Sequence, residues 1–295
     1  MISRSEIIAL LLRTVLKVNS SPVSSTDTKI VFFLGTHRTG TQLIANFFDQ
    51  GFANVKSCHQ LSSHKLLNIL STLMLHGYLP SSLFNSAVDF LLARRLRRME
   101  CSTYIETTGW NYVAAKRIIQ TFPDVRVIHL VRDPREFVPS YLNVIRNRRK
   151  SWIASYLVPF WTISAVAVGA LGSHEWANMT PFDRLCWTWA YKNQYLENTY
   201  KSENYLLLRL EDLTNPKSRS GTLATLFAFI DIPLSEGDGD FLSQRHNTQF
   251  REEGETWRRW PMDKCQRLHN ICGDLMSRYG YGTEIEWQNK LRKVN

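Results

Sequence analysis

The chain has 295 residues, of which 44% are hydrophobic and 21% are charged. This length and composition exclude a globally disordered chain and fit one large α/β domain or two small ones. The formal net charge of +10 indicates an anionic partner: nucleic acid, an acidic membrane surface or a polyanionic small molecule. The five cysteines are scattered without C-x-x-C spacing, so we expect reduced thiols and neither a zinc site nor a disulfide framework.

Residues 1–28 are predicted to form an N-terminal helix and a linker. The stretch "EIIALLLRTVL" is short and contains Arg13, which is typical of an amphipathic or buried helix and not of a secretory signal or membrane anchor. The polar stretch 19–28 then leads into the core. Together with reduced thiols, these features predict a cytoplasmic protein.

Residues 29–295 are predicted to form a single α/β domain in which strands alternate with helices. Strands are expected at residues 29–34, 102–107, 125–131 and 204–210, and helices at 41–50, 110–120, from 134 onward, and at 221–230. Apolar runs that alternate with helices favour a parallel sheet covered by helices on both faces. Helical insertions are expected at about 60–100 and 145–200.

The second insertion contains an apolar segment, residues 152–171, which has no charged residue. Its length is close to that of a membrane span, and the basic cluster at 146–150 precedes it. Pro159 and Gly169 interrupt the run, so we expect a buried or membrane-dipping segment and not a true span. A membrane-dipping segment would give peripheral membrane contact through residues 146–171.

The first expected strand leads into a phosphate-loop pattern, "GTHRTGT". Gly35 and Gly40 have the spacing of the nucleotide-triphosphate loop G-x-x-x-x-G-K-[ST], but Thr41 replaces the lysine and Gln42 replaces the magnesium-holding hydroxyl residue. Backbone N–H groups of this turn can converge on one phosphate, and Arg38 adds a charged donor. The sequence also lacks a clear Walker-B aspartate. The loop therefore predicts a phosphate group that is bound without a metal.

A second anion-binding pattern follows the third expected strand, in "VIHLVRDPREFVPSYL". Arg132 stands at the carboxyl end of that strand, and Asp133 can cap the helix that Pro134 begins. Ser140 follows one or two helical turns later. Carboxyl ends of parallel strands share one edge of a sheet, so Arg132 and Ser140 predict a second anion site beside the first.

Taken together, these motifs resemble the sulfotransferases that use 3′-phosphoadenosine 5′-phosphosulfate (PAPS). "FFLGTHRTGTQL" resembles their loop for the 5′-phosphosulfate, and "VIHLVRDPREFVPSYL" resembles their 3′-phosphate motif. "ETWRRWPMDKCQRLHNICGDLMSRYGY" resembles the segment that closes over the nucleotide. The donor-binding residues implied by the resemblance are Gly35, Thr36, His37, Arg38, Thr39, Gly40, Thr41, Gln42, Arg132, Ser140, Trp257 and Arg258. The implied fold is three-layered and P-loop-NTPase-like.

The resemblance implies in-line transfer of a sulfuryl group from PAPS to a hydroxyl or amine, without a metal. Arg38 is expected to stabilise the charge on the leaving phosphate. Two residues are candidates for the base: His59 lies near the place where carbohydrate- and tyrosine-directed relatives have a glutamate, and Glu106 lies near the place where cytosolic relatives have a histidine. Thr108 occupies that histidine position itself.

The sequence does not determine the acceptor, and it is compatible with two other classes of function. The apolar and aromatic segment suits a lipid-like acceptor, and a glycan is the other main candidate. A degenerate P-loop nucleotide kinase or NTPase is one rival, which the missing lysine opposes. A basic, non-catalytic module that binds anions or membranes is the other. We do not expect nucleic-acid binding, because the two arginine clusters, at residues 94–98 and 146–150, lie in separate insertions and not on one stripe.

Overall fold

The computed structural model describes residues 28–52, 54–59, 64–96, 101–109, 112–121, 125–147, 161–200, 203–234, 240–243 and 256–292. The predicted N-terminal helix and most of its linker lie outside these residues. So do the first nine residues of the apolar segment, 152–160.

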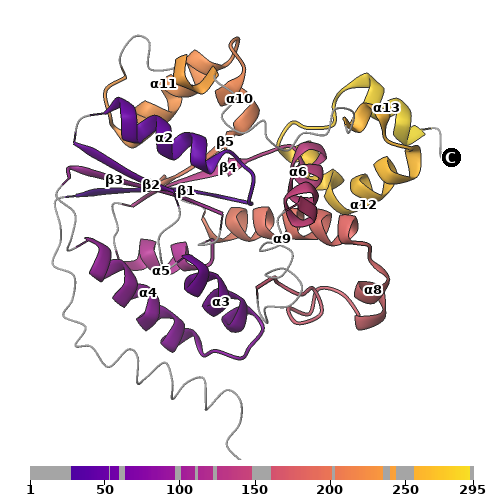
Figure 1. Ribbon diagram of the computed structural model, residues 1–295, viewed down its shortest axis with the longest axis horizontal. Coiled ribbons are helices and arrows are strands. Elements are labelled where there is room, and N and C mark those ends of the chain that lie inside the picture. Colours follow the sequence, from indigo (N-terminus) through magenta and orange to yellow (C-terminus); the bar gives the residue numbers. More distant parts are fainter. Residues whose placement is uncertain are drawn as a thin grey trace, which may run out of the picture.

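The centre of the fold is a sheet of five parallel strands in the order β2-β3-β1-β4-β5 (Figure 1). The strands are β1 (Lys29–Gly35), β2 (Val55–His59), β3 (Thr103–Thr108), β4 (Arg126–Val131) and β5 (Tyr205–Arg209). The parallel sheet and four of its strands confirm the sequence prediction to within two residues. The edge strand β2 was not predicted, because its polar sequence, VKSCH, lacks the apolar run of a buried strand.

Helices cover both faces of the sheet, as predicted: α2 and α11 lie on one face, and α3, α4 and α5 on the other (Figure 1). The helices are α2 (Thr41–Gly51), α3 (His64–Leu75), α4 (Ser81–Leu96), α5 (Ala114–Thr121), α6 (Pro134–Asn147), α8 (Ser173–Asn178), α9 (Pro181–Thr199), α10 (Leu210–Thr214), α11 (Arg219–Ile230), α12 (Met262–Arg278) and α13 (Ile285–Arg292). Two short 3-10 helices, η1 (Asp240–Ser243) and η2 (Trp257–Arg259), complete the described elements.

The alternation of side chains along β1 supplies two separate cores. Phe32 and Leu34 pack into the core under α3, α4 and α5, while Val31 and Phe33 pack into the core under α2 and α11. All four side chains are fully buried. Successive strand residues point to opposite faces, so a central strand covered on both sides is apolar throughout. This is why the run at residues 29–34 predicted the strand well.

A third core joins the C-terminal helices to α6 and encloses a buried arginine. Arg135 donates hydrogen bonds to Asp133 (2.6 Å) and Glu284 (2.7 Å), and its guanidinium lies 4.6 Å from the ring centre of Trp257 and 5.0 Å from that of Trp287. Burial opposes the charge on Arg135, but the hydrogen bonds to the two carboxylates outweigh it and raise the pKa of Arg135. The arginine thus ties the start of α6 to the C-terminal segment.

The two expected insertions contain α3 and α4 in the first and α8 and α9 in the second. Helix α9 begins with a capping box, in which Asp183 N donates to Thr180 Oγ1 and Thr180 N donates to Asp183 Oδ2. In the described part of the apolar segment, Ile163 and Ala165 are buried against Trp187. Among the residues that the structure describes, no helix is long and apolar enough to cross a membrane.

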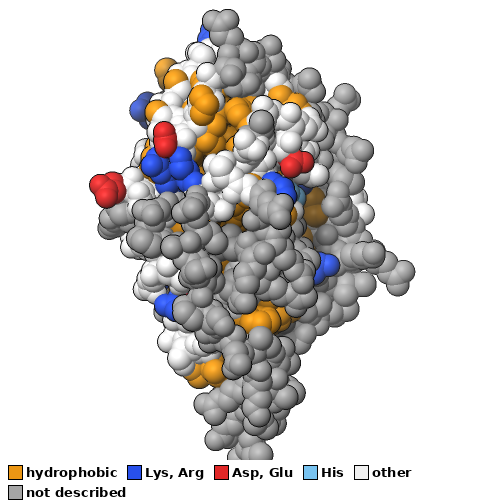
Figure 2. Space-filling view, turned by 90° about the vertical axis from the view of Figure 1, so that its left-hand side faces the viewer, with side chains coloured by type: hydrophobic (Ala, Val, Ile, Leu, Met, Phe, Trp, Pro, Cys, Tyr) orange, Lys and Arg blue, Asp and Glu red, His pale blue; other side chains and the backbone are white. Residues whose placement is uncertain are grey.

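The charged surface is described only in part. Figure 2 shows one face, on which described Lys and Arg side chains lie apart from one another. Several of the described basic residues are paired with carboxylates, among them Lys29 with Asp231 at 2.8 Å and Arg117 with Asp89 at 2.6 Å. Most of the two arginine clusters lies outside the described side chains, so membrane contact and a cytoplasmic location stay predictions.

The burial of His129 on β4 makes the free energy of unfolding depend on pH. It is fully buried, with Nε2 2.9 Å from Asn193 Oδ1 and Nδ1 2.6 Å from the hydroxyl of Tyr205. These partners suit a neutral ring that donates from Nε2 and accepts at Nδ1. Burial lowers the pKa of His129 to about 4. In the unfolded chain the imidazole takes up a proton already near pH 6.5.

We expect the free energy of unfolding to fall as the pH drops from 6.5 towards 4. The stabilisation from neutral His129 is complete above the unfolded pKa and is lost as the pH falls, by up to about 1.4 kcal/mol per pH unit. Urea unfolding at pH 7, 6 and 5 measures this slope. His129→Gln should flatten the slope, whereas His174→Gln, a matched change on exposed helix α8, should not. Equal slopes in all three proteins would contradict the assignment.

Candidate active site

The loop between β1 and α2 has a backbone that only its glycines permit. A Cβ on Gly35 would lie 2.3 Å from the carbonyl oxygen of Leu130 on the neighbouring strand. Gly40 has φ of 77°, and a Cβ there would lie 2.6 Å from a methyl carbon of Leu210. Arg38 also has a positive φ, 67°, which is rare for a residue with a side chain. The loop is therefore held in a tight turn at the carboxyl end of the sheet.

The start of α2 has the features of an anion site. Its N-cap, Gly40, provides no side-chain cap, and the first turn contains no acidic residue. The first N–H groups of a helix have no partner within the helix, so they can bind an anion. The hydroxyl of Thr36 is fully buried and has no hydrogen-bond partner among the described residues. In contrast, the hydroxyl of Thr39 donates to the carbonyl of Thr36 at 2.7 Å and holds the turn closed.

The two predicted anion motifs meet directly. Arg38 Nε donates to Ser140 Oγ at 3.0 Å, and Arg132 Nη1 donates to the carbonyl oxygen of Arg38 at 2.8 Å. Arg132 also lies 3.6 Å from the carboxylate of Glu136, one turn further along α6. Residues that are 94 and 102 positions apart in the sequence thus form one rim beside the loop, as the shared edge of β1 and β4 predicts.

The position of Arg132 is fixed by the turn that follows it. Asp133 Oδ1 accepts a hydrogen bond from the backbone N–H of Arg135 at 2.8 Å and so caps α6, as predicted. The N–H of Asp133 donates to Glu211 Oε1 at 3.0 Å, and Tyr281 OH donates to Glu211 Oε2 at 2.7 Å. Burial raises the pKa of Glu211. Glu211 thus orients the turn and has no described contact with the phosphate loop.

The first candidate base, His59, lies at the end of β2 on the α2 face of the sheet. Its Nδ1 is 3.3 Å from Thr107 Oγ1, which itself donates to the carbonyl of Thr41 at 2.8 Å. Because that hydroxyl has one proton, the contact suits an imidazole that donates from Nδ1. His59 therefore lies beside the first residue of α2.

The second candidate base, Glu106, lies on the opposite face of the sheet. It is paired in register with Phe32 and Cys58, which belong to the core under α3, α4 and α5. Glu106 is 1% exposed, and its carboxylate accepts a hydrogen bond from Tyr104 OH at 3.1 Å. The structure thus separates the two candidates by the sheet, and the role of each stays a prediction.

The remaining predicted donor residues lie in different surroundings. Gln42 is exposed on the first turn of α2. Trp257 is buried in the C-terminal core against Arg135 and Trp287, and the guanidinium carbon of Arg258 lies 4.5 Å from its ring centre. Their contact with the nucleotide stays a prediction.

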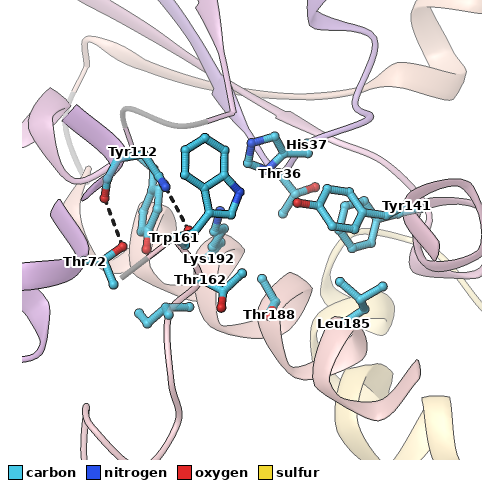
Figure 3. A pocket seen from close by; sticks show the side chains of 13 residues that line it. Thr36, His37, Thr72, Tyr112, Tyr141, Trp161, Thr162, Leu185, Thr188 and Lys192 are labelled. Atoms are coloured by element: carbon cyan, nitrogen blue, oxygen red, sulfur yellow. Dashed lines mark hydrogen bonds between the residues drawn. The ribbon is translucent and has the colours of Figure 1, made fainter. Parts of the chain in front are cut away.

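A pocket opens directly beside the loop (Figure 3). It is lined by Thr36, His37, Asn68, Thr72, Tyr112, Phe137, Tyr141, Trp161, Thr162, Ile163, Leu185, Thr188 and Lys192. Its volume is about 40 Å³, which has room for a few water-sized groups. Neither His59 nor Glu106 is among these lining residues.

Lys192 is a titratable residue of this pocket that no sequence motif indicated. It is 7% exposed, and burial lowers its pKa to about 8. Leu185, Thr188 and Lys192 line the pocket from α9 at positions i, i+3 and i+7, which share one face of a helix. That spacing was visible in the sequence, but nothing in the sequence placed this face of α9 beside the phosphate loop.

Among the described residues, no group of three or more His, Cys, Asp or Glu side chains could hold a metal ion. The donors around the loop are instead backbone N–H groups, hydroxyls and arginines. Such donors suit phosphate and sulfate oxygens.

Solved structures with a similar fold are sulfotransferases. The sulfotransferase from Alicyclobacillus acidocaldarius is 12% identical, with 90% of this chain and 100% of that chain covered and a TM-score of 0.51. STF9 from Mycobacterium avium is 12% identical, with 96% and 84% covered and a TM-score of 0.51. Mouse SULT7A1, complexed with PAP, is 13% identical, with 92% and 90% covered and a TM-score of 0.51. At this identity the likeness shows the fold alone.

No curated protein matches the sequence significantly. A model of the sulfotransferase family, however, matches residues 78–236, more than half of the chain. The matched region contains the Arg132 and Ser140 motif, and the phosphate loop precedes it. The predicted family and the predicted three-layer fold are both confirmed, and the chain belongs to the sulfotransferase family.

Proposed function

We propose that this sulfotransferase uses PAPS as its donor and transfers the sulfuryl group to a hydroxyl or amine of an acceptor. The observation that carries the proposal is the contact of Arg38 with both Arg132 and Ser140 at the start of α2. PAPS has a phosphosulfate at one end and a 3′-phosphate at the other, so it requires two anion sites within one rim. Mouse SULT7A1, which shares the fold, was crystallised with PAP.

In this proposal two groups of residues bind the two anionic ends of the donor. The N–H groups at the start of α2, the hydroxyl of Thr36 and the guanidinium of Arg38 hold the phosphosulfate. Arg132 and Ser140 hold the 3′-phosphate. When bound, PAPS supplies the sulfuryl group and a bisphosphate leaving group. Arg38 then stabilises the negative charge that develops on the 5′-phosphate.

The rival nucleotide kinase reading requires a lysine and a magnesium-holding hydroxyl at positions 41 and 42. Thr41 is buried at the N-terminus of α2 and donates no positive charge, and Gln42 is exposed. A γ-phosphate with its metal would therefore lack both of its usual ligands. The acceptor stays open between lipid-like and glycan alcohols; aromatic rings and hydroxyl groups line the pocket beside the loop in comparable number.

Binding of adenosine 3′,5′-bisphosphate without magnesium tests the two anion sites. We expect Arg38→Ala and Arg132→Ala each to weaken binding about 10- to 100-fold, because each removes charge-assisted hydrogen bonds to phosphate. Isothermal titration measures the change. Arg126→Ala is the matched control: Arg126 lies at the opposite end of the same strand, β4, and contacts Phe229. ATP with magnesium should bind weakly to all four proteins. Tight ATP–magnesium binding, or equal bisphosphate affinity in all variants, would refute the proposal.

The two threonines of the loop provide a second, sharper test. Thr36→Val removes a buried hydroxyl that has no described partner, so the free energy of unfolding should not fall while bisphosphate binding weakens about two- to tenfold. Thr39→Val breaks the hydrogen bond to the carbonyl of Thr36 and should cost about 1 kcal/mol of stability. Thermal unfolding and titration on the same samples measure both quantities. Destabilisation by Thr36→Val with unchanged affinity would show that this hydroxyl has a structural role.

Transfer itself is measured with ³⁵S-labelled PAPS and four acceptors: 4-nitrophenol, cholesterol, dodecanol and lactose. Labelled sulfate released by water is counted in parallel. We expect transfer to at least one of these alcohols, and loss of that transfer in Arg38→Ala.

A further inference from the structure

The pocket beside the phosphate loop is narrow as well as close to the donor site. In Figure 3, Thr36 and His37 of the loop lie on one side of it, and Thr188 and Leu185 approach it from α9. Its volume of about 40 Å³ has room for about three water-sized groups. We propose that this pocket takes the hydroxyl end of the acceptor and admits only a primary alcohol, in which the carbon that carries the oxygen is bonded to one further carbon. This inference rests on the proposed function, because it requires PAPS on the loop.

The phosphate loop determines which part of the pocket faces the donor. Thr36 is fully buried, and its hydroxyl has no hydrogen-bond partner among the described residues. A buried hydroxyl without a partner is unfavourable, so this one points to a group that a ligand supplies. In the proposed function that group is the phosphosulfate, which places the donor sulfur beside Thr36. Thr162 also lines the pocket and is exposed, so the pocket reaches the surface there. An acceptor that enters past Thr162 therefore meets the sulfur with its leading hydroxyl.

Aromatic side chains that are fixed by packing form two walls of the pocket. Tyr112 is buried; its carbonyl oxygen accepts a hydrogen bond from Tyr200 OH at 3.2 Å, and its ring meets that of Tyr195 edge-on, with ring centres 5.4 Å apart. Phe137 is also buried and stacks on Tyr141, with ring centres 5.8 Å apart. Close-packed side chains resist the insertion of extra atoms, because these force rotamers and backbone out of place. These walls therefore do not widen easily to accept a branched group.

The segment that begins at Trp161 forms another wall and is attached to α3 at two points. Asn68 Nδ2 of α3 donates to the carbonyl oxygen of Trp161 at 2.8 Å. The N–H of Ser164 donates to Nε2 of His76, the residue directly after α3, at 3.1 Å. Because both hydrogen bonds lie within four residues of this segment, it cannot move away from α3 without breaking one of them. This wall is therefore also fixed in place.

The size of the pocket separates classes of alcohol. The end of a primary alcohol places one oxygen and two carbons in a row, which is about three water-sized groups. A secondary alcohol adds a further carbon beside the oxygen, and a phenol or a sterol has a ring there. The pocket lining combines aromatic rings with threonine hydroxyls, which suits both the carbons and the oxygen of such an end. Long-chain lipid alcohols and sugars with a free hydroxymethyl group share this chemistry.

The transfer to a primary alcohol balances without a further reactant. The acceptor oxygen attacks the donor sulfur and forms a new S–O bond, while the bond between sulfur and the bridging oxygen of the 5′-phosphate breaks. The electrons of that bond leave with adenosine 3′,5′-bisphosphate. The hydroxyl proton is released to solvent by the end of the reaction. The products are the alkyl sulfate, the bisphosphate and one proton.

Pairs of acceptors that differ at the hydroxyl test this selectivity. Butan-1-ol and butan-2-ol present the chain end alone, and dodecan-1-ol and dodecan-2-ol add a lipid chain. Methyl β-D-galactopyranoside and its 6-deoxy analogue, which lacks the primary hydroxyl, represent glycans. Transfer from ³⁵S-labelled PAPS to each acceptor gives kcat/KM. We expect the primary alcohol of a pair to be preferred at least about tenfold, because an extra carbon against a close-packed wall opposes binding.

Two substitutions at Leu185 test whether this pocket causes the preference. Leu185→Ala enlarges the pocket and should reduce the preference for butan-1-ol over butan-2-ol at least about threefold. Leu185→Phe fills the pocket and should lower kcat/KM for butan-1-ol at least about tenfold, with bisphosphate affinity unchanged. Leu291→Ala is the matched control and should keep the wild-type preference, because Leu291 is partly buried against the same core as Leu185 but is not among the residues that line the pocket. Urea unfolding shows whether each variant is folded.

Bisphosphate titration separates a failure of this inference from a failure of the proposed function. A protein that binds adenosine 3′,5′-bisphosphate but transfers the sulfuryl group to none of the three primary alcohols would overturn the inference. Equal kcat/KM for the two members of a pair would overturn it too, as would an unchanged preference in both Leu185 variants. A protein that does not bind the bisphosphate would instead refute the proposed function. Faster transfer to dodecan-1-ol or to the galactoside supports the inference in either case, and it identifies a lipid or a glycan as the source of the primary alcohol.

Discussion

The site depends on one hydrogen bond, from the guanidinium of Arg132 to the carbonyl oxygen of Arg38. It joins the loop after β1 to the turn after β4, two neighbouring strands whose carboxyl ends meet at Gly35 and Leu130. The same backbone segment has a positive φ at Arg38, a conformation that costs free energy without such support. The hydrogen bond therefore stabilises the strained loop and brings the second anion site to it.

That hydrogen bond is in turn supported by a buried ionic network. Arg135, three residues after Arg132, is fixed by Asp133 and Glu284 and lies against two tryptophan rings. Buried ion pairs contribute little net stability when they replace an apolar core, but breaking one partner is costly. Their value here is positional: with Asp133 capping α6 and bound to Glu211, the turn that presents Arg132 has few alternative arrangements. The C-terminal helices thus act on the donor site through packing.

The sequence predicted the central features because they depend on local chemistry. An apolar run followed by spaced glycines requires a strand and a tight turn, and the strand ends place Arg132 near the loop. It was harder to predict on which face of the sheet each candidate base lies. Glu106 lies within a predicted strand, whereas His59 ends the unpredicted strand β2. The register of β2 with β3 places the two residues on opposite faces. Trp257 showed a motif resemblance, while its burial against Arg135 depends on residues from three distant segments.

The burial of Lys192 beside the phosphate loop was also not predictable, because it depends on tertiary contacts. In "CWTWAYKNQYLENTY" a lysine among aromatic residues reads as an ordinary amphipathic helix. Only the anchoring of Trp189 to Arg132 and of Asn193 to His129 turns that face of α9 towards the loop. Removing an ammonium from water is unfavourable, so burial at this position lowers the stability that the helix would otherwise provide. A capping box and two contacts to the sheet offset that cost. Titratable side chains whose unfavourable burial is offset by surrounding contacts are frequent at functional sites.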